Sequence, residues 1–146
     1  MFLYSEYLFI IIIFFTIYYA IYLKMNHWFN RTDLFLIHLS IIGCIFNILA
    51  FIKPQYILIE IGHITLATTI FLGSILYSSE WISYMFVLWV LYLLPVRYYY
   101  DKCPYYIFYP ILNEDGVVIT SSKFNNMCFI LSFAMVCAKT LARIKV

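Results

Sequence analysis

Long apolar segments dominate the chain, and short polar stretches separate them. Five segments approach the ~20 consecutive apolar residues that a helix needs to cross the hydrocarbon core of a bilayer. They cover residues 7–23, 34–52, 56–77, 81–96 and 124–142. This pattern predicts an all-α integral membrane protein, with about five transmembrane helices in a single multi-span domain over residues 1–146.

The stretches between these segments carry residues that favour helix ends. Lys53-Pro54 separates the second and third segments, where proline cannot continue the preceding helix but is tolerated at the start of the next. Ser78 and Ser79 offer caps before the fourth segment. That segment is short and contains Pro95, so we expect it to be tilted or partly interfacial.

The longest break predicts one extramembrane loop, residues 97–123. Pro104, Pro110 and the turn-forming stretch NEDG at 113–116 oppose a continuous helix there. Its clustered tyrosines are typical of a membrane–water interface, and NEDG favours a small hairpin.

Composition supports the membrane class. The chain is 66% hydrophobic and 11% charged, whereas a soluble domain averages about 25% charged residues. No basic run indicates a nucleic-acid partner. The four cysteines form no CxxC pair, so we expect neither a metal site nor a disulfide framework; they are Cys44, Cys103, Cys128 and Cys137.

The abundance of Ile, Phe and Tyr is what an AT-rich genome encodes. It suits an organelle-encoded gene, with a nuclear gene of an AT-rich organism as the alternative. The first apolar run begins close to Met1 and lacks a small-residue cleavage site, so we interpret it as a retained helix. Five spans place the termini on opposite sides, and the basic residues favour a C-terminus on the matrix or cytoplasmic side.

The third segment contains polar residues that are unusual in a membrane span. Glu60 and His63 are three apart and share one face of a helix, with Gly62 between them and Gly73 further on. A carboxylate in mid-bilayer costs at least ~2.5 to 3.5 kcal/mol on insertion scales, so Glu60 needs water, a partner or a proton. Three interpretations stay open: an interfacial or capping position, a proton or water path, and packing against a polar neighbour.

Two histidines offer a further alternative. His38 and His63 lie on neighbouring segments and are candidate ligands of a b-type haem, although each also suits an ordinary hydrogen-bonding role. No nucleophile arrangement and no glycine-rich phosphate loop stand out. We therefore expect a chain that is non-catalytic by itself and belongs to a large membrane assembly.

The number and arrangement of the predicted spans, and the sequence of the third, resemble chain 6 of the proton-translocating NADH:ubiquinone oxidoreductase, respiratory complex I. That family's third helix carries Tyr-x-Gly-Ala-Ile before a long apolar run; here the stretch reads Glu60-Ile61-Gly62-His63-Ile64. The Gly and Ile agree, while Glu60 replaces the Tyr and His63 the Ala. The other spans match in placement and not in motif.

The resemblance implies a function for the third span. In the family this helix can hold a π-bulge, and its rotation helps couple quinone reduction to proton pumping. Glu60, Gly62 and His63 would then be proton-path or gating residues. The chain would bind no cofactor itself, because FMN, iron–sulfur clusters and ubiquinone lie elsewhere in that complex. Its partners would be the lipid bilayer and other membrane-arm subunits, in the mitochondrial inner membrane.

Other assignments compete with chain 6. Chain 4L of the same complex has intramembrane glutamates that relay protons, but it has three spans. A haem-binding succinate dehydrogenase anchor would use His38 and His63. A structural subunit of ATP synthase or of a cytochrome complex would use the third span for packing alone.

Overall fold

A computed structural model describes residues 2–100 and 122–144, and all its regular structure is helical. The chain is an all-α membrane protein, as its sequence predicted, and three of its helices are long and apolar enough to cross a bilayer. The helices are α1 (Phe2–Asn26), α2 (Arg31–Ile52), α3 (Tyr56–Leu76), α4 (Glu80–Tyr100) and α7 (Ser122–Ile144). Within α4 and α7 the apolar parts Glu80–Val96 and Ile130–Lys139 are shorter.

Helix ends differ from the predicted spans where side chains extend them. The second span begins at Arg31 and not at residue 34, because Asn30 Oδ1 accepts a hydrogen bond from the Asp33 amide at 2.7 Å and caps the first turn. α4 continues through Pro95 to Tyr100, so the first residues of the predicted 97–123 loop are helical. A proline in a span is tolerated where neighbouring groups take up the freed carbonyl. The hairpin predicted at 113–116 lies outside the described residues.

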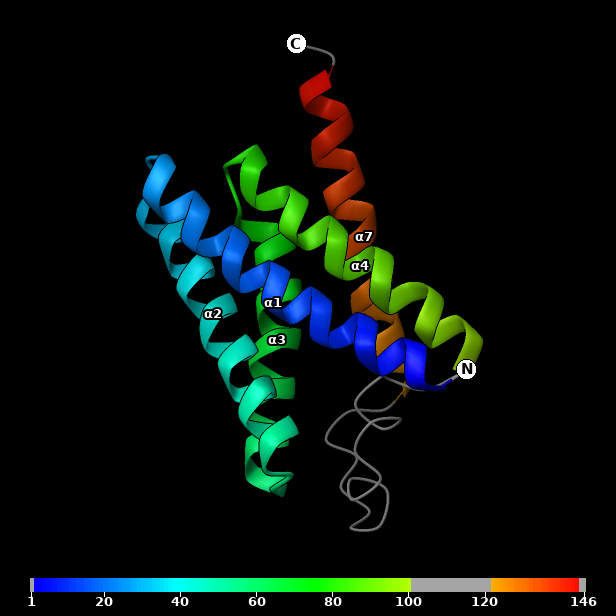
Figure 1. The fold of residues 1–146 in the computed structure, drawn as a ribbon. Helices are drawn as coiled ribbons and strands as arrows, with labels where there is room; N and C mark the ends of the chain where they lie inside the picture. Colours follow the sequence, from blue (N-terminus) through cyan, green and yellow to red (C-terminus); the bar gives the residue numbers. More distant parts are fainter. Residues whose placement is uncertain (1, 101–121, 145–146) are drawn as a thin grey trace.

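The helices form two antiparallel pairs (Figure 1). α2 and α3 lie side by side as a hairpin, and α1 and α4 cross them. α7 packs against α3 and α4. The end of α1, the start of α2, the end of α3 and the start of α4 meet at one end of the bundle, which we call the upper end (Figure 1).

Small residues line the α2–α3 interface. Gly43 of α2 lies against Thr65 and Leu66 of α3, and Gly62 of α3 lies against Asn47 of α2. Small side chains let two helix backbones approach closely, which is the usual basis of helix association in a membrane. The hairpin is therefore held by backbone proximity more than by large interlocking side chains.

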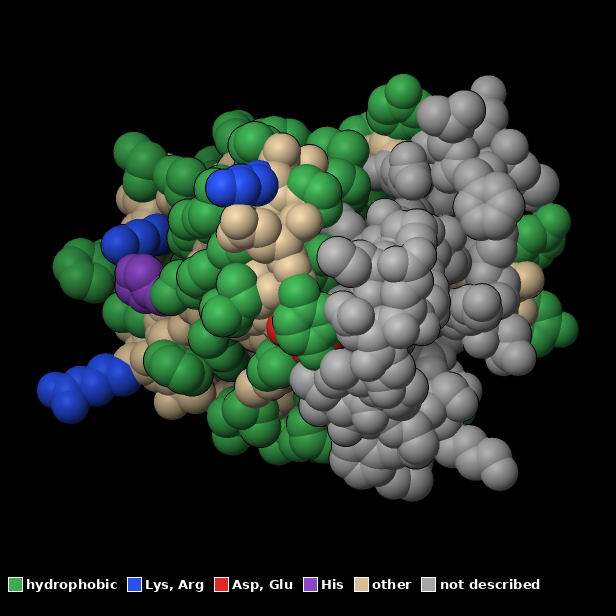
Figure 2. All heavy atoms as spheres, turned by 90° about the horizontal axis from the view of Figure 1, so that it is seen from below, with side chains coloured by type: hydrophobic (Ala, Val, Ile, Leu, Met, Phe, Trp, Pro, Cys, Tyr) green, Lys and Arg blue, Asp and Glu red, His purple; other side chains and the backbone are tan. Residues whose placement is uncertain are grey.

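Aromatic rings join the other pair of helices to this hairpin. Phe9 of α1 is fully buried, and its ring centroid lies 5.8 Å from that of Phe51 on α2. The ring centroids of Trp89 and Tyr92 on α4 each lie 5.9 Å from that of Phe9. The outer surface is hydrophobic as well, and Figure 2 shows such side chains covering most of the described lower face.

Candidate functional site

The structure places the predicted residues Glu60, Gly62 and His63 within one turn of α3. Glu60 is 8% exposed, and its carboxylate accepts a hydrogen bond from the Tyr56 hydroxyl one turn earlier. Gly62 is buried, and His63 is half-buried with contacts of its own. Glu60 is thus sheltered from the surroundings, close to the start of its helix.

Gly62 faces α2, and the side chain of Asn47 on that helix leaves no room for a larger residue at position 62. Asn47 is fully buried and its Nδ2 donates to the carbonyl oxygen of Gly43 at 2.7 Å, with a longer contact to that of Gly62 at 3.4 Å. A Cβ atom at position 62 would lie 3.1 Å from the same Nδ2. Close helix approach is therefore the immediate reason for this glycine. α3 is α-helical from Tyr56 to Leu76, without the π-bulge that the chain 6 resemblance suggested.

His38 and His63 are not brought together. His38 is exposed near the start of α2, where its Nδ1 donates to the Leu34 carbonyl at 2.7 Å and its Nε2 accepts from Lys24 at 3.1 Å. His63 follows Gly62, which is level with Asn47 on α2. His38 lies nine residues from Asn47, or about 13 Å along the helix axis. The described part of the chain also holds no cluster of three residues able to bind a metal.

A second polar group, which sequence reasoning did not single out, lies at the upper end of the bundle. The Asp33 side chain is 2% exposed and accepts three hydrogen bonds from the α3–α4 connection. Two come from the backbone N–H groups of Ser78, at 3.0 Å, and Ser79, at 3.1 Å, and the third from the Ser78 hydroxyl at 2.8 Å. Asn30 adds a bond to the same hydroxyl at 2.5 Å.

Lys139 of α7 binds the other side of this connection. Its ammonium donates to the carbonyl oxygens of Ile75 at 2.5 Å and Tyr77 at 3.2 Å, and lies 4.2 Å from the centre of the Tyr77 ring. The carbonyls at a helix C-terminus lack partners within the helix, and the helix dipole favours a cation there. The dipole likewise favours the Asp33 carboxylate at the start of α4.

We call Asn30, Asp33, Ser78, Ser79 and Lys139 the polar junction. Caps were predicted at Ser78 and Ser79, and the structure does place them immediately before α4. The side chain that binds their amides, however, comes from α2. Asn30 three residues before Asp33 is a local sign of a helix start, but no local pattern reports the distant partner of Asp33. The tertiary hydrogen bonds of Lys139 were likewise not evident from the sequence.

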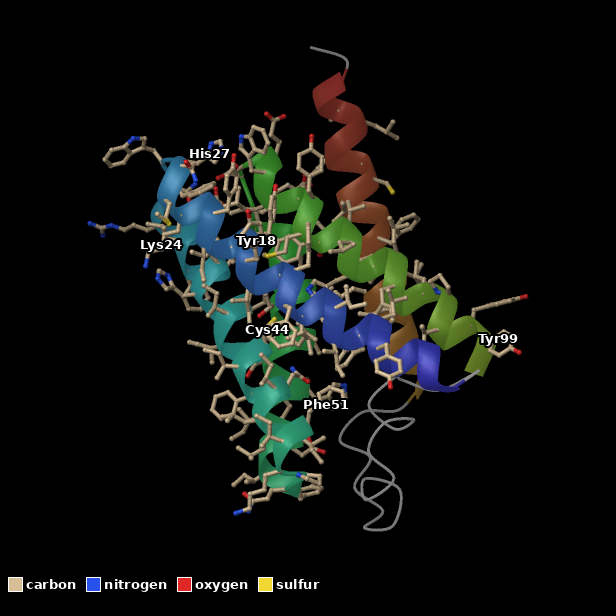
Figure 3. All side chains as sticks on the ribbon, in the orientation of Figure 1. Tyr18, Lys24, His27, Cys44, Phe51 and Tyr99 are labelled. Carbon is tan, nitrogen blue, oxygen red and sulfur yellow. The ribbon has the colours of Figure 1, made fainter. Side chains whose placement is uncertain are left out.

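The structure describes the side chains of two cysteines. Cys44 is buried between helices and Cys137 is half-buried, and both are free thiols. Figure 3 shows Lys24 and His27 toward the upper end, Cys44 in the middle of the bundle and Phe51 below it. Most of these polar side chains hold helices together, and Glu60 and His63 form a titratable pair on one turn of α3.

No protein-family model, curated protein or solved structure matches this chain.

Proposed function

We propose that this chain is a non-catalytic, multi-pass subunit of a larger membrane complex, and that the complex is the proton-translocating NADH:ubiquinone oxidoreductase of the mitochondrial inner membrane. The observation that carries the proposal is the buried carboxyl group of Glu60 inside an apolar span. Ionisable groups within spans are expensive, and they commonly mark ion or proton pathways. His63, one turn further along α3, supplies a second titratable group beside it.

The outer surface of α1 supports a role in an assembly. Tyr18 lies in the middle of the first span, and its side chain is 69% exposed. A hydroxyl facing hydrocarbon loses the hydrogen bond that water would provide, which costs free energy. A neighbouring subunit that offers an acceptor removes this cost. Tyr7 and Phe14 are exposed on the same helix and extend the surface available to such a neighbour.

The packing of α3 defines how coupling would work under this proposal. Its upper end is held through Lys139 and the polar junction, while Glu60 and His63 lie in its lower half. Rotation of that half would have to open the close contact between Gly62 and Asn47. The glycine thus acts as the point at which α3 moves against α2, and a larger side chain there would block the motion.

The first test is the identity of the complex. Mitochondrial membranes of the source organism are solubilised mildly and separated on a native gel, and mass spectrometry locates this chain. Migration with in-gel NADH dehydrogenase activity is expected. Migration with succinate dehydrogenase, ATP synthase or a cytochrome complex would refute the assignment to the NADH-oxidising complex.

The second test addresses α3 within the assembled complex. Glu60→Gln is expected to lower the proton transport driven by NADH oxidation, at an unchanged level of assembly. Gly62→Leu is expected to uncouple proton transport or to block assembly, because a Cβ atom at position 62 already crowds Asn47. Ile61→Leu and Thr68→Ala are the matched controls, because both residues are exposed on the same helix. Full coupling in the Gly62 and Glu60 variants would reduce α3 to a packing element.

A further inference from the structure

Two hollows differ in chemistry: one lies in the seam between α1 and α4, and the other lies at the start of α4, where Trp81 contacts His27 just after α1. The lower one is an apolar groove of about 370 Å³, lined by residues that include Leu8, Ile11 and Phe15 from α1 and Leu88 and Leu91 from α4. The upper one is an open pocket of about 360 Å³ at the start of α4. Its lining consists of Ser78, Ser79, Glu80 and Trp81. The seam is therefore apolar below and polar above, like a phospholipid.

Aromatic rings connect the two hollows. Trp81, which lines the upper pocket, has its ring centroid 4.7 Å from that of His27, and His27 lies 6.4 Å from Tyr22. Tyr22 stacks on Tyr19 at 6.5 Å, and Tyr19 on Phe15 at 5.9 Å. Phe15 lines the lower groove. These aromatic side chains thus form a continuous row between the two hollows.

The upper pocket suits a cation. Its one charged lining residue is Glu80, whose side chain is exposed at the start of α4. Next to it, the rings of Trp81 and Tyr84 lie 6.1 Å apart at 71°, forming two walls of a corner. Both rings are partly exposed. Aromatic faces attract quaternary ammonium groups through cation–π interactions, and a carboxylate adds to that attraction.

We infer that the α1–α4 seam is a binding site for one choline phospholipid. The choline group lies at Glu80, Trp81 and Tyr84, and an acyl chain occupies the apolar groove. The lining of the upper pocket contains neither lysine nor arginine, so an anionic headgroup gains no ion pair there. Lys24, the basic residue near the end of α1, is hydrogen-bonded to His38 on α2. The site is independent of which complex holds the chain.

The test compares two lipids that differ in the headgroup alone. The full chain is purified in detergent with equal amounts of dioleoyl phosphatidylcholine and dioleoyl phosphatidylglycerol, and native mass spectrometry counts the lipids retained. We expect phosphatidylcholine to be retained about fivefold over phosphatidylglycerol, the ratio that one cation–π contact of ordinary strength supports. Equal retention, or a preference for phosphatidylglycerol, would overturn the inference.

Variants separate the headgroup from the acyl chain. Trp81→Leu and Glu80→Gln should each bring the ratio toward one, and Glu80→Gln preserves side-chain size so that folding is maintained. Ile11→Trp should fill the groove and lower the retention of both lipids. Tyr98→Leu is the control, because Tyr98 is a 94% exposed aromatic residue at the opposite end of α4 from Trp81. A loss in Tyr98→Leu equal to that in Trp81→Leu would show that retention is not specific to this seam.

Discussion

The two ends of α3 use polar residues in different ways. In the lower half, Asn47 and Gly62 form a contact between two helices whose own backbone hydrogen bonds are already complete. At the upper end, Asp33 and Lys139 bind backbone groups that the helices leave without partners. Both regions use side-chain hydrogen bonds to backbone groups. Removing Asp33 or Lys139, however, should destabilise the fold more than removing Asn47.

The difference follows from where backbone groups are already paired. A carbonyl inside a helix accepts from the amide four residues on, so an added side-chain donor such as Asn47 gains little. Hydrogen bonds between membrane helices average about 0.6 kcal/mol. Amides at a helix start and carbonyls at a helix end have no such partner, and leaving one buried and unpaired costs about 1 to 3 kcal/mol. Stability should therefore depend on the polar junction more than on the middle of the span.

Removing the Asp33 carboxylate should cause the largest loss of stability at the polar junction. Asp33→Ala deprives the amides of Ser78 and Ser79 of their acceptor, and we expect a loss of about 3 kcal/mol in the free energy of unfolding. Thermal unfolding in detergent, followed by circular dichroism, measures the change. Thr32→Ala is the control, because Thr32 is the exposed neighbour in the same turn. Equal midpoints for the two variants would show that the junction is not the stabilising element.

Adding one methyl group at Gly73 should have the next largest effect. A Cβ atom there would lie within 2.1 to 2.7 Å of the buried Phe86 ring of α4, which must move. Overpacking of this kind costs about 1 to 3 kcal/mol. Phe86→Leu in the same chain should recover part of the loss, and a double-mutant cycle measures how much. Gly43→Ala is the control, since its nearest neighbours lie at 3.4 Å; simple additivity in the cycle would contradict the contact.

Lys139→Met tests the other half of the junction. The methionine keeps much of the apolar stem and removes the ammonium that caps α3, so we expect a loss of about 1 kcal/mol. Lys53→Met, at an exposed position between α2 and α3, controls for the loss of charge alone. Hydrogen exchange of the last turn of α3 gives the local readout, and it should accelerate in the Lys139 variant only. An unchanged rate would mean that Lys139 does not cap the helix.

Asn47→Ala should have the smallest effect of the series. The substitution removes one donor and leaves carbonyls that remain bonded within their helices, so we expect a loss of about 0.6 kcal/mol. The same variant should relieve crowding at Gly62, making Gly62→Ala less harmful in the double variant than alone. Thermal unfolding of the four proteins of this cycle measures both effects. A loss in Asn47→Ala as large as that in Asp33→Ala would reverse the ranking of the two regions.

The fold class and the positions of the helices follow from the amino-acid pattern alone. Apolar runs of span length must form helices in a membrane, because each backbone group needs a partner within the segment. The predicted spans therefore fall on α1, α2, α3, α4 and α7. Their ends were less predictable, since the cap at Asn30 and the continuation through Pro95 depend on local geometry. The placement of Glu60, Gly62 and His63 on one turn of α3 also followed from spacing alone.

The contacts between distant polar residues, in contrast, depend on how the helices pack. Asp33 reaches Ser78 across 45 positions of the chain, and Lys139 reaches Ile75 across 64. No periodicity encodes such contacts, because they depend on how helices turn back and cross. The close approach of Gly62 to Asn47 and the separation of His38 from His63 are of the same kind. Spacing assigns a residue to a face of its helix, and the packing of the helices determines what that face contacts.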